Sequence, residues 1–258
     1  MRVKLSNYIS RKLVESGIIH AFSVVGGGAM HLNNALGHEP GLEVTYNHHE
    51  QASAIAAECY ARIHNRPAAV CVTTGPGGTN AITGVVGAWL DSIPMMVISG
   101  QIRYDWTARY ALSRGARVRA LGDQEFDICT SIASMTKYSE MVIDPLRIRF
   151  CMEKALWIMK TGRPGPVWLD IPLDVQGAFI ETEDLIGFDS ENYMAGGTGW
   201  AAPSEHAVPA DEAGKGEYRP VLPAPVSEET AKEIIAKIRA ANGHPAWPQG
   251  NKANPSGG

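Results

Sequence analysis

Several features are scarce or missing in this sequence of 258 residues, and each absence excludes a class of protein. No run reaches about 18 apolar residues and the first residues have no apolar core, so we expect neither a membrane span nor a secretory signal. Lys and Arg number 23 against 27 Asp and Glu, and no basic run or basic-aromatic stripe occurs, which argues against nucleic acid as a partner. The four cysteines form no C-x-x-C pair and no His stands at zinc spacing, so we expect small buried thiols in a reducing compartment. These absences together predict a soluble, cytoplasmic protein.

The common nucleotide-binding and hydrolase fingerprints are also missing. Two glycine loops precede predicted helices, Gly26 to Gly28 and Gly75 to Gly78, but His31 and Asn80 stand where G-x-G-x-x-G needs its third glycine. No G-x-x-x-x-G-K-[ST] or G-x-S-x-G sequence is present. A Rossmann-type redox domain, a P-loop NTPase and a serine hydrolase are therefore disfavoured. The loops can still aim backbone N–H groups at an anion, although tight turns explain the glycines equally well.

Short apolar runs alternate with helical periodicity over most of the chain. Runs of nearly continuous hydrophobicity indicate buried parallel strands, and the segments between them indicate helices on both faces. The sequence therefore predicts an α/β fold, a three-layer and mostly parallel Rossmann-like sheet, followed by a mostly irregular C-terminal tail. The expected strands are residues 21–25, 42–46, 68–74, 94–98 and 167–171, and the expected helices are residues 5–16, 29–37, 50–64, 75–90, 123–132 and 145–160.

The composition changes near residue 188, which suggests where the domain ends. We expect a folded domain at residues 1–187 and a linker rich in Gly, Pro and Ala at residues 188–225. Residues 226–241 predict one isolated, capped, amphipathic helix, and residues 242–258 an unstructured tail.

Glu50 is the candidate catalytic group that the residues themselves suggest. It stands in the first turn of the helix after the second strand, where an acid can simply complement the helix dipole. The residues that follow, 52–57, are almost all Ala and Ile, so we expect a dry carboxyl group of the kind that shares or exchanges a proton. The two glycine loops and Glu50 all follow strand ends, the edge where open α/β sheets bind ligands. A metal reading of the sequence His48-His49-Glu50 is disfavoured because adjacent residues do not face one another, and no metal ligand is predicted.

Taken together, these stretches resemble the N-terminal pyrimidine-binding (PYR) domain of thiamine-diphosphate enzymes, in particular that of the acetolactate synthase large subunit. The resemblance spans about residues 5–175. Many ordered matches make it specific, although each motif alone is weak. The best-matching parts are His49-Glu50-Gln51, Thr74 to Asn80, Leu90 to Pro94, Ser99-Gly-Gln101 and Gly162 to Val175.

The resemblance implies a role for several residues and a reaction for the whole enzyme. Glu50 would hydrogen-bond the ring nitrogen of the cofactor's aminopyrimidine, which helps the cofactor lose its thiazolium proton. A 2-keto acid would then lose CO2 and add to a second carbonyl. Lys137, which from the residues alone reads as a solvated lysine at a strand end, matches a channel or interface position. By the same resemblance the pyrimidine or substrate channel is lined by Gly26, Gly27, Pro76, Asn80 and Gln101, and Gln124 also matches a channel or interface position.

Two departures from the family pattern bear on the substrate. Val24-Val25 stands where acetolactate synthases usually have Tyr-Pro before the first glycine pair. The segment from Arg103 to Gly122 is longer than in those enzymes and carries five arginines, which suits a larger or more anionic keto acid. The same segment can equally be a solvated rim of a dimer.

A third departure is the missing G-D-G…N motif, which in the family holds Mg²⁺ and the diphosphate on a C-terminal domain. Gly122-Asp123 is followed here by Gln124. We therefore expect either a truncated member or one half of a split enzyme, needing a partner chain with the diphosphate site. A non-catalytic dimerising or regulatory remnant is the alternative. FAD lies mostly outside the matched region in the family, so it is possible but not predicted. We also expect a homodimer or higher oligomer, formed through the helices that follow Glu50 and Gly78.

Overall fold

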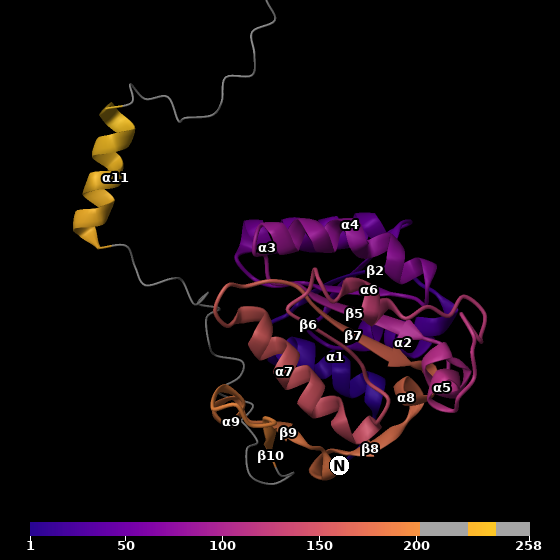
Figure 1. Cartoon of the computed structure of the whole chain (residues 1–258). Helices are drawn as coiled ribbons and strands as arrows, with labels where there is room; N and C mark the ends of the chain where they lie inside the picture. Colours follow the sequence, from indigo (N-terminus) through magenta and orange to yellow (C-terminus); the bar gives the residue numbers. More distant parts are fainter. Residues whose placement is uncertain (202–226, 241–258) are drawn as a thin grey trace, which may run out of the picture. The chain divides into compact units, whose positions relative to one another are not determined.

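The apolar runs of the chain pair into one parallel sheet in its computed structural model, which describes residues 1–201 and 227–240 (Figure 1). The strand order is β3-β2-β4-β5-β7-β6, and each neighbouring pair is parallel. The predicted α/β class is confirmed. The strands are β2 His20–Ser23, β3 Glu43–Tyr46, β4 Ala69–Val72, β5 Met96–Gln101, β6 Tyr138–Met141 and β7 Val167–Pro172.

Helices cover both faces of this sheet, as the sequence predicts. Figure 1 shows α3 and α4 on one face and α1 and α7 on the other. The first face carries α3 Glu50–His64, α4 Pro76–Leu90 and α6 Ile128–Ile132; the second carries α1 Leu5–Glu15, α2 Met30–His38, α7 Ile148–Lys160 and the short α8 Leu173–Gly177.

The central strands send alternate side chains into two separate cores. Along β4, Ala69 and Cys71 join the core under α1, α2 and α7, whereas Val70 and Val72 join the core under α3 and α4. This period of two explains why the interior strands read as continuous apolar runs, since both faces are buried.

Helices α3 and α4 lie unusually close together because small residues face one another. A Cβ built on Gly84 would lie only 2.6 Å from the Cβ of Ala54. Ala57 and Ala81 are fully buried in the same core. These small residues are thus used for packing within the chain, and the self-association expected through the same helices stays a prediction.

Several elements were missed or misjudged from the sequence. The helix predicted at residues 123–132 is wrong except for α6, because Asp127 caps a helix that begins only at Ile128. Strand β6 was missed because Ser139 and Glu140 interrupt its apolar pattern, as an edge strand paired only with β7 permits. Cys59 is exposed on α3, although buried thiols were expected, and the other three cysteines are buried. Other unpredicted pieces are α5 Ala108–Ser113 and the strands β1 Arg2–Lys4 and β8 Phe179–Glu181, which pair with each other.

Residues 187–201 form structure where the sequence suggests the beginning of a linker. The antiparallel strands β9 Gly187–Phe188 and β10 Trp200–Ala201 flank α9 Ser190–Met194. Aromatic rings hold this piece against α7: Phe188 and Tyr193 both contact the ring of Trp157. The rest of the predicted linker, residues 202–226, and the predicted tail, residues 242–258, lie outside the described residues.

The chain divides into two units, residues 1–221 and 222–258. In the second unit the structure describes α11 Glu228–Ala240, where the sequence predicts an isolated helix. Its N-terminus is capped by Ser227, whose Oγ accepts a hydrogen bond from the backbone N–H of Thr230 at 3.1 Å. No helix of the described residues is long and apolar enough to cross a membrane.

Candidate functional site

The two glycine loops and Glu50 meet at the carboxyl edge of the sheet, around Thr73. A Cβ on Gly26 would lie 2.5 Å from the Cβ of Thr73, and one on Gly77 would lie 2.8 Å from Thr73 Cγ2. The same Gly77 position lies 3.5 Å from Glu50 Oε1. The backbone N–H of Gly28 donates to Thr73 Oγ1 at 3.1 Å. The expected convergence of these three segments is confirmed, and it depends on glycine, because larger residues would not fit between the loops.

Glu50 begins α3 as predicted, but its carboxylate is not dry. The side chain is half-buried, and Asn80 Nδ2 donates to its Oε2 at 3.0 Å. The apolar neighbours do not surround it: Ala54 and Ala57 point into the core, while Ala52 and Ile55 are exposed. The structure therefore gives a carboxylate that is oriented by one amide and open to a ligand.

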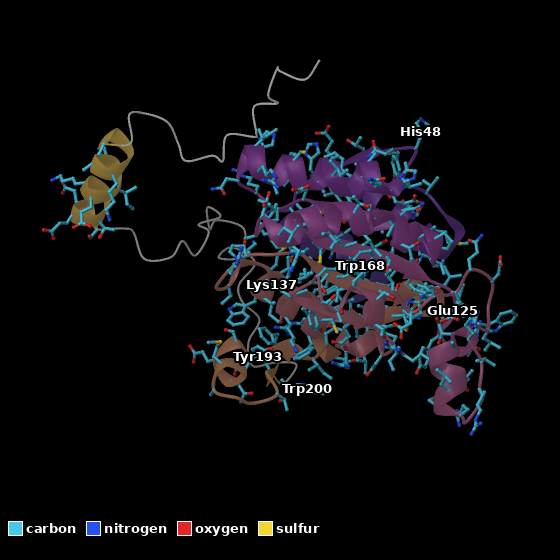
Figure 2. All side chains as sticks on the ribbon, turned by 45° about the horizontal axis from the view of Figure 1, so that its top comes forward. His48, Glu125, Lys137, Trp168, Tyr193 and Trp200 are labelled. Carbon is cyan, nitrogen blue, oxygen red and sulfur yellow. The ribbon has the colours of Figure 1, made fainter. Side chains whose placement is uncertain are left out.

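His48 and His49 do not form a metal site with Glu50. His49 caps α3, since its Nδ1 accepts from the backbone N–H of Gln51 at 3.1 Å, and His48 is exposed (Figure 2). Within the described part of the chain, no group of three or more His, Cys, Asp or Glu side chains could hold a metal ion.

The segment after β5 folds back over the second glycine loop. Gly75 has φ +54°, and a Cβ there would lie 1.9 Å from the carbonyl oxygen of Gln124. Gln124 itself has φ +56°, a conformation that residues with a side chain rarely adopt. Gln124 is thus brought to the same edge as Glu50, and its backbone, more than its exposed side chain, packs against the loop.

Gln101 ends β5 at this edge, but its side chain points into the protein. Its Nε2 donates to the carbonyl oxygen of Phe126 at 2.9 Å and to Asp170 Oδ2 at 3.1 Å, and its Oε1 accepts from the N–H of Ile102. Gln101 is 1% exposed, so it holds neighbouring segments in place.

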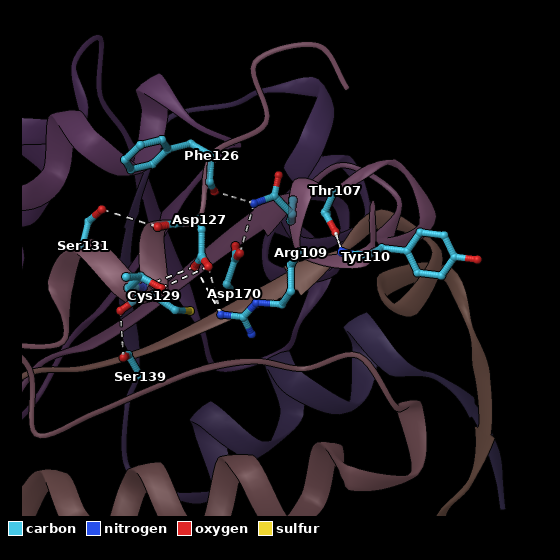
Figure 3. Close-up of polar contacts among 11 residues, drawn as sticks. Thr107, Arg109, Tyr110, Phe126, Asp127, Cys129, Ser131, Ser139 and Asp170 are labelled. Atoms are coloured by element: carbon cyan, nitrogen blue, oxygen red, sulfur yellow. Dashed lines mark hydrogen bonds and ion pairs between the residues drawn. The ribbon is translucent and has the colours of Figure 1, made fainter. Parts of the chain in front are cut away.

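Asp170 is a buried acid that the sequence reasoning missed. It is fully buried on β7, accepts a hydrogen bond from Ser99 Oγ at 2.6 Å, and lies among Phe126, Asp127 and Arg109 (Figure 3). Burial raises its pKa to about 7, against the opposing effect of the hydrogen bonds. The signal available in the sequence was one Asp inside an otherwise apolar predicted strand.

Gln176 was also missed, and it fixes the first glycine loop. Its Nε2 donates to the carbonyl oxygens of Gly28 and Ile171, both at 2.7 Å. The carbonyl of Gly28 is held so close to β5 that a Cβ on Gly100 would lie 2.1 Å from it. No helical or strand periodicity marks Gln176, because its role follows from long-range contacts.

An apolar groove opens beside the first glycine loop, with a volume of about 390 Å³. The positive charge in its lining is neutralised, because Arg103 forms two hydrogen bonds to Asp105, at 3.0 and 3.1 Å. The lining is Gly27, Gly28, Met30, Ile102, Arg103, Trp106, Asp123 and Leu173. The groove therefore suits a hydrocarbon group or a ring better than an anionic group.

Lys137 lies at the opposite edge of the sheet from Glu50. It precedes β6, and so lies at the amino edge of the parallel sheet, well away from His48 and Glu125 in Figure 2. Its Nζ donates to the carbonyl oxygens of Ile158 and Thr161 at the end of α7, and burial lowers its pKa. This lysine caps a helix C-terminus.

The geometry is that of a parallel α/β domain with candidate ligand-binding residues at the carboxyl ends of its strands, where such sheets bind ligands. Residues 3–121 match the model of the thiamine pyrophosphate enzyme, N-terminal TPP binding domain. This stretch of the chain is therefore similar to the PYR domain of the thiamine pyrophosphate enzymes.

Curated relatives agree with this assignment. The acetolactate synthase large subunit of Buchnera aphidicola (subspecies Schizaphis graminum) is 38% identical over 167 residues, covering 65% of this chain and 27% of that protein. The acetolactate synthase isozyme 3 large subunit of Escherichia coli K12 is 34% identical over 167 residues, which again cover 65% of this chain and 27% of that protein. The chloroplastic enzyme of Arabidopsis thaliana is 32% identical over 173 residues, 67% of this chain and 24% of that protein. The matched region thus spans about a quarter of these relatives.

Proposed function

We propose that this chain is the pyrimidine-binding half of a thiamine-diphosphate enzyme of acetolactate synthase type, which decarboxylates a 2-keto acid and joins the remainder to a second carbonyl. The observation that carries the proposal is the position of Glu50. Its carboxylate stands beside the second glycine loop at the carboxyl edge, with one oxygen fixed by Asn80 and the other towards Gly77.

The residues at this edge fit the pyrimidine part of the cofactor. An open carboxylate at a helix N-terminus can accept a hydrogen bond from a ring N–H and hold that proton in place. Asn80 keeps the carboxylate from turning away, since its amide donates to Oε2. Gly27 has no atom within 4 Å of the place a Cβ would take, so the first glycine loop leaves open space at this edge of the sheet. When bound, thiamine diphosphate supplies the electron sink for loss of CO2.

We assign the apolar groove to the substrate, a small 2-keto acid. The groove adjoins Gly27 and Gly28, so a substrate there would lie next to the ring that Glu50 holds. The pairing of Arg103 with Asp105, and of Arg109 with Asp127 at 3.1 Å, leaves less free positive charge than the sequence suggests. A keto acid with a hydrocarbon side chain is therefore favoured over a dianionic one.

We place the diphosphate and Mg²⁺ in a separate domain, on a continuation of the chain or on a partner chain. This part of the proposal is supported by the curated relatives, in which the matched region is about a quarter of the protein. We make no proposal for FAD.

We also propose that the chain self-associates through α3 and α4. Large apolar side chains are exposed on these helices: Ile55 (39%), Ile63 (77%), Trp89 (38%) and Leu90 (66%). Sedimentation at tens of micromolar should show a dimer or larger species, and Ile63→Glu should weaken it. A strictly monomeric wild-type chain would contradict this part.

The catalytic proposal is tested by reconstitution. The chain is mixed with thiamine diphosphate, Mg²⁺, pyruvate and an acetolactate synthase large subunit lacking its own N-terminal domain, and CO2 release is measured. We expect release with the wild-type chain, strong loss with Glu50→Gln, and no loss with Glu43→Gln, an exposed acid on the neighbouring strand. If Glu50→Gln supports release as well as wild type, the assigned role is wrong. A chain that binds the partner but never supports release would point to a non-catalytic domain.

A further inference from the structure

Asp170 is an ionisable group in the interior that the proposed reaction does not use. Its carboxyl group is 0% exposed and has only neutral hydrogen-bond donors, Ser99 Oγ at 2.6 Å and Gln101 Nε2 at 3.1 Å. Ser99 is itself fixed by the indole N–H of Trp168 at 2.8 Å. The pKa near 7 that burial gives Asp170 means that both charged and neutral forms are present at neutral pH.

The segment between β5 and α6, residues 102–127, here called the covering segment, brings Arg109, Phe126 and Asp127 beside this carboxyl group (Figure 3). Within the segment, Arg109 of α5 forms an ion pair with Asp127 at the C-terminal end, at 3.1 Å. Gln101 ties the segment down, because the same Nε2 that contacts Asp170 also donates to Phe126 O. If this segment lifts, the hydrogen bond from Gln101 to Phe126 is lost and the cover over Asp170 is reduced.

The charges that face Asp170 come from the covering segment and from α6. Arg109 favours the ionised form and Asp127 disfavours it, so their effects oppose each other. Burial raises the pKa of the Cys129 thiol, which therefore stays neutral. On the neighbouring β6, Glu140 pairs in register with Leu169, a residue of the core on the opposite face of the sheet, so its side chain points away from Asp170.

The covering segment is also the part that closes over the second glycine loop. The carbonyl of Gln124 packs on Gly75, and Gly75 leads directly into α4. The first turns of α4 carry Asn80, which holds Glu50. A movement of the segment would therefore shift Asn80 and, with it, the carboxylate of Glu50 on which the proposed function depends.

We propose that neutral Asp170 is the positioning group that keeps residues 102–127 closed over the Gly75 loop, and that ionisation of Asp170 releases this segment. The physical reason is linkage: a carboxyl group that is desolvated only in the closed state holds its proton more tightly there, so losing the proton favours the open state. Only the catalytic consequence rests on the proposed function; the movement itself does not.

Amide hydrogen exchange on the whole chain tests this inference. After correction for intrinsic exchange rates, the opening of residues 102–127 should increase with pH, by up to about tenfold per unit between about pH 5 and pH 7, and level off above. Asp170→Asn is neutral at every pH and nearly the same shape, so this rise should vanish. Asp123→Asn, an exposed acid in the same segment, should behave as wild type.

An equal rise in wild type and Asp170→Asn would overturn the proposal. If Asp170→Asn does not fold, carbon-13 titration of the wild-type carboxyl decides instead. The signal of Asp170 and the amide signal of Phe126 should then follow one titration curve near pH 7. A carboxyl that titrates below about pH 5, near the ordinary value of an Asp, overturns the proposal as well. None of these readouts needs turnover, so they stand apart from a failure of the proposed function.

Discussion

Gly84→Ala should destabilise the protein, although alanine is the better helix former. In a helix interior the change alone gains about 1 kcal/mol. The added Cβ would lie 2.6 Å from the Cβ of Ala54, 2.7 Å from its carbonyl carbon and 2.8 Å from the backbone nitrogen of Ile55. Carbon atoms in contact prefer about 3.5–4.0 Å, so α3 and α4 must part by about 1 Å. Overpacking of this kind costs about 1–3 kcal/mol or more, and against backbone atoms we expect the upper end, a net loss of about 1–3 kcal/mol.

Urea unfolding of Gly84→Ala measures this loss, with Gly37→Ala as the control. In the control the new Cβ meets only Tyr46 Oη, at 3.1 Å and on a side chain that can move, so its stability should stay within about 1 kcal/mol of wild type. Because Glu50 and Asn80 stand on the first turns of α3 and α4, the side-chain amide signal of Asn80 should also shift in Gly84→Ala. A Gly84→Ala protein as stable as wild type, or more so, would refute the account of the helix contact.

Two further predictions concern charged groups. The folded-state pKa of Asp170 is raised from 3.8 to about 7. The contribution of this group to the free energy of unfolding is therefore greatest below about pH 4 and is lost as the pH rises to about 7. The wild-type free energy of unfolding should therefore fall by up to about 4 kcal/mol more than that of Asp170→Asn over this range, and parallel urea curves would contradict it. Arg62 joins Glu58, which is 8% exposed, to Asp91. Arg62→Ala leaves the buried carboxylate of Glu58 without its ion-pair partner and should lower the folding stability by about 1–3 kcal/mol. Asp91→Ala removes an exposed partner of Arg62 and should lower it by at most about 1 kcal/mol. Equal losses would be inconsistent with the burial of Glu58.

The sequence predicts the interior of the sheet well, because burial on both faces leaves a continuous apolar run. Strands β2, β4, β5 and β7 fall within or close to the predicted runs, and α3 begins and ends at the predicted residues. The edge strand β6 was not predicted, because an edge strand can carry polar residues such as Ser139 and Glu140, which interrupt the apolar pattern. The covering segment was not predicted either, because Gln124 packs against Gly75, which is distant in the sequence.

At the site, the meeting of the two glycine loops with Glu50 follows from parallel topology and could be predicted. The surroundings of Glu50 could not, because Asn80 lies 30 residues away in the sequence. The same holds for the buried network, where Ser99 and Asp170 are 71 residues apart. A local pattern carries no information on such a pair until the strand order is known.

The central claim is that Glu50 and the glycine loops hold an aminopyrimidine ring, and one titration tests it most directly. 4-Amino-5-hydroxymethyl-2-methylpyrimidine, the ring half of the cofactor, is added to the nitrogen-15-labelled chain and the amide signals are followed. We expect the amides of Gly26, Gly27 and Gly77 to shift together, and Glu50→Gln to weaken binding by about tenfold, because a charge-assisted hydrogen bond is lost. Shifts confined to another face of the sheet, or equal binding by Glu50→Gln, would contradict it.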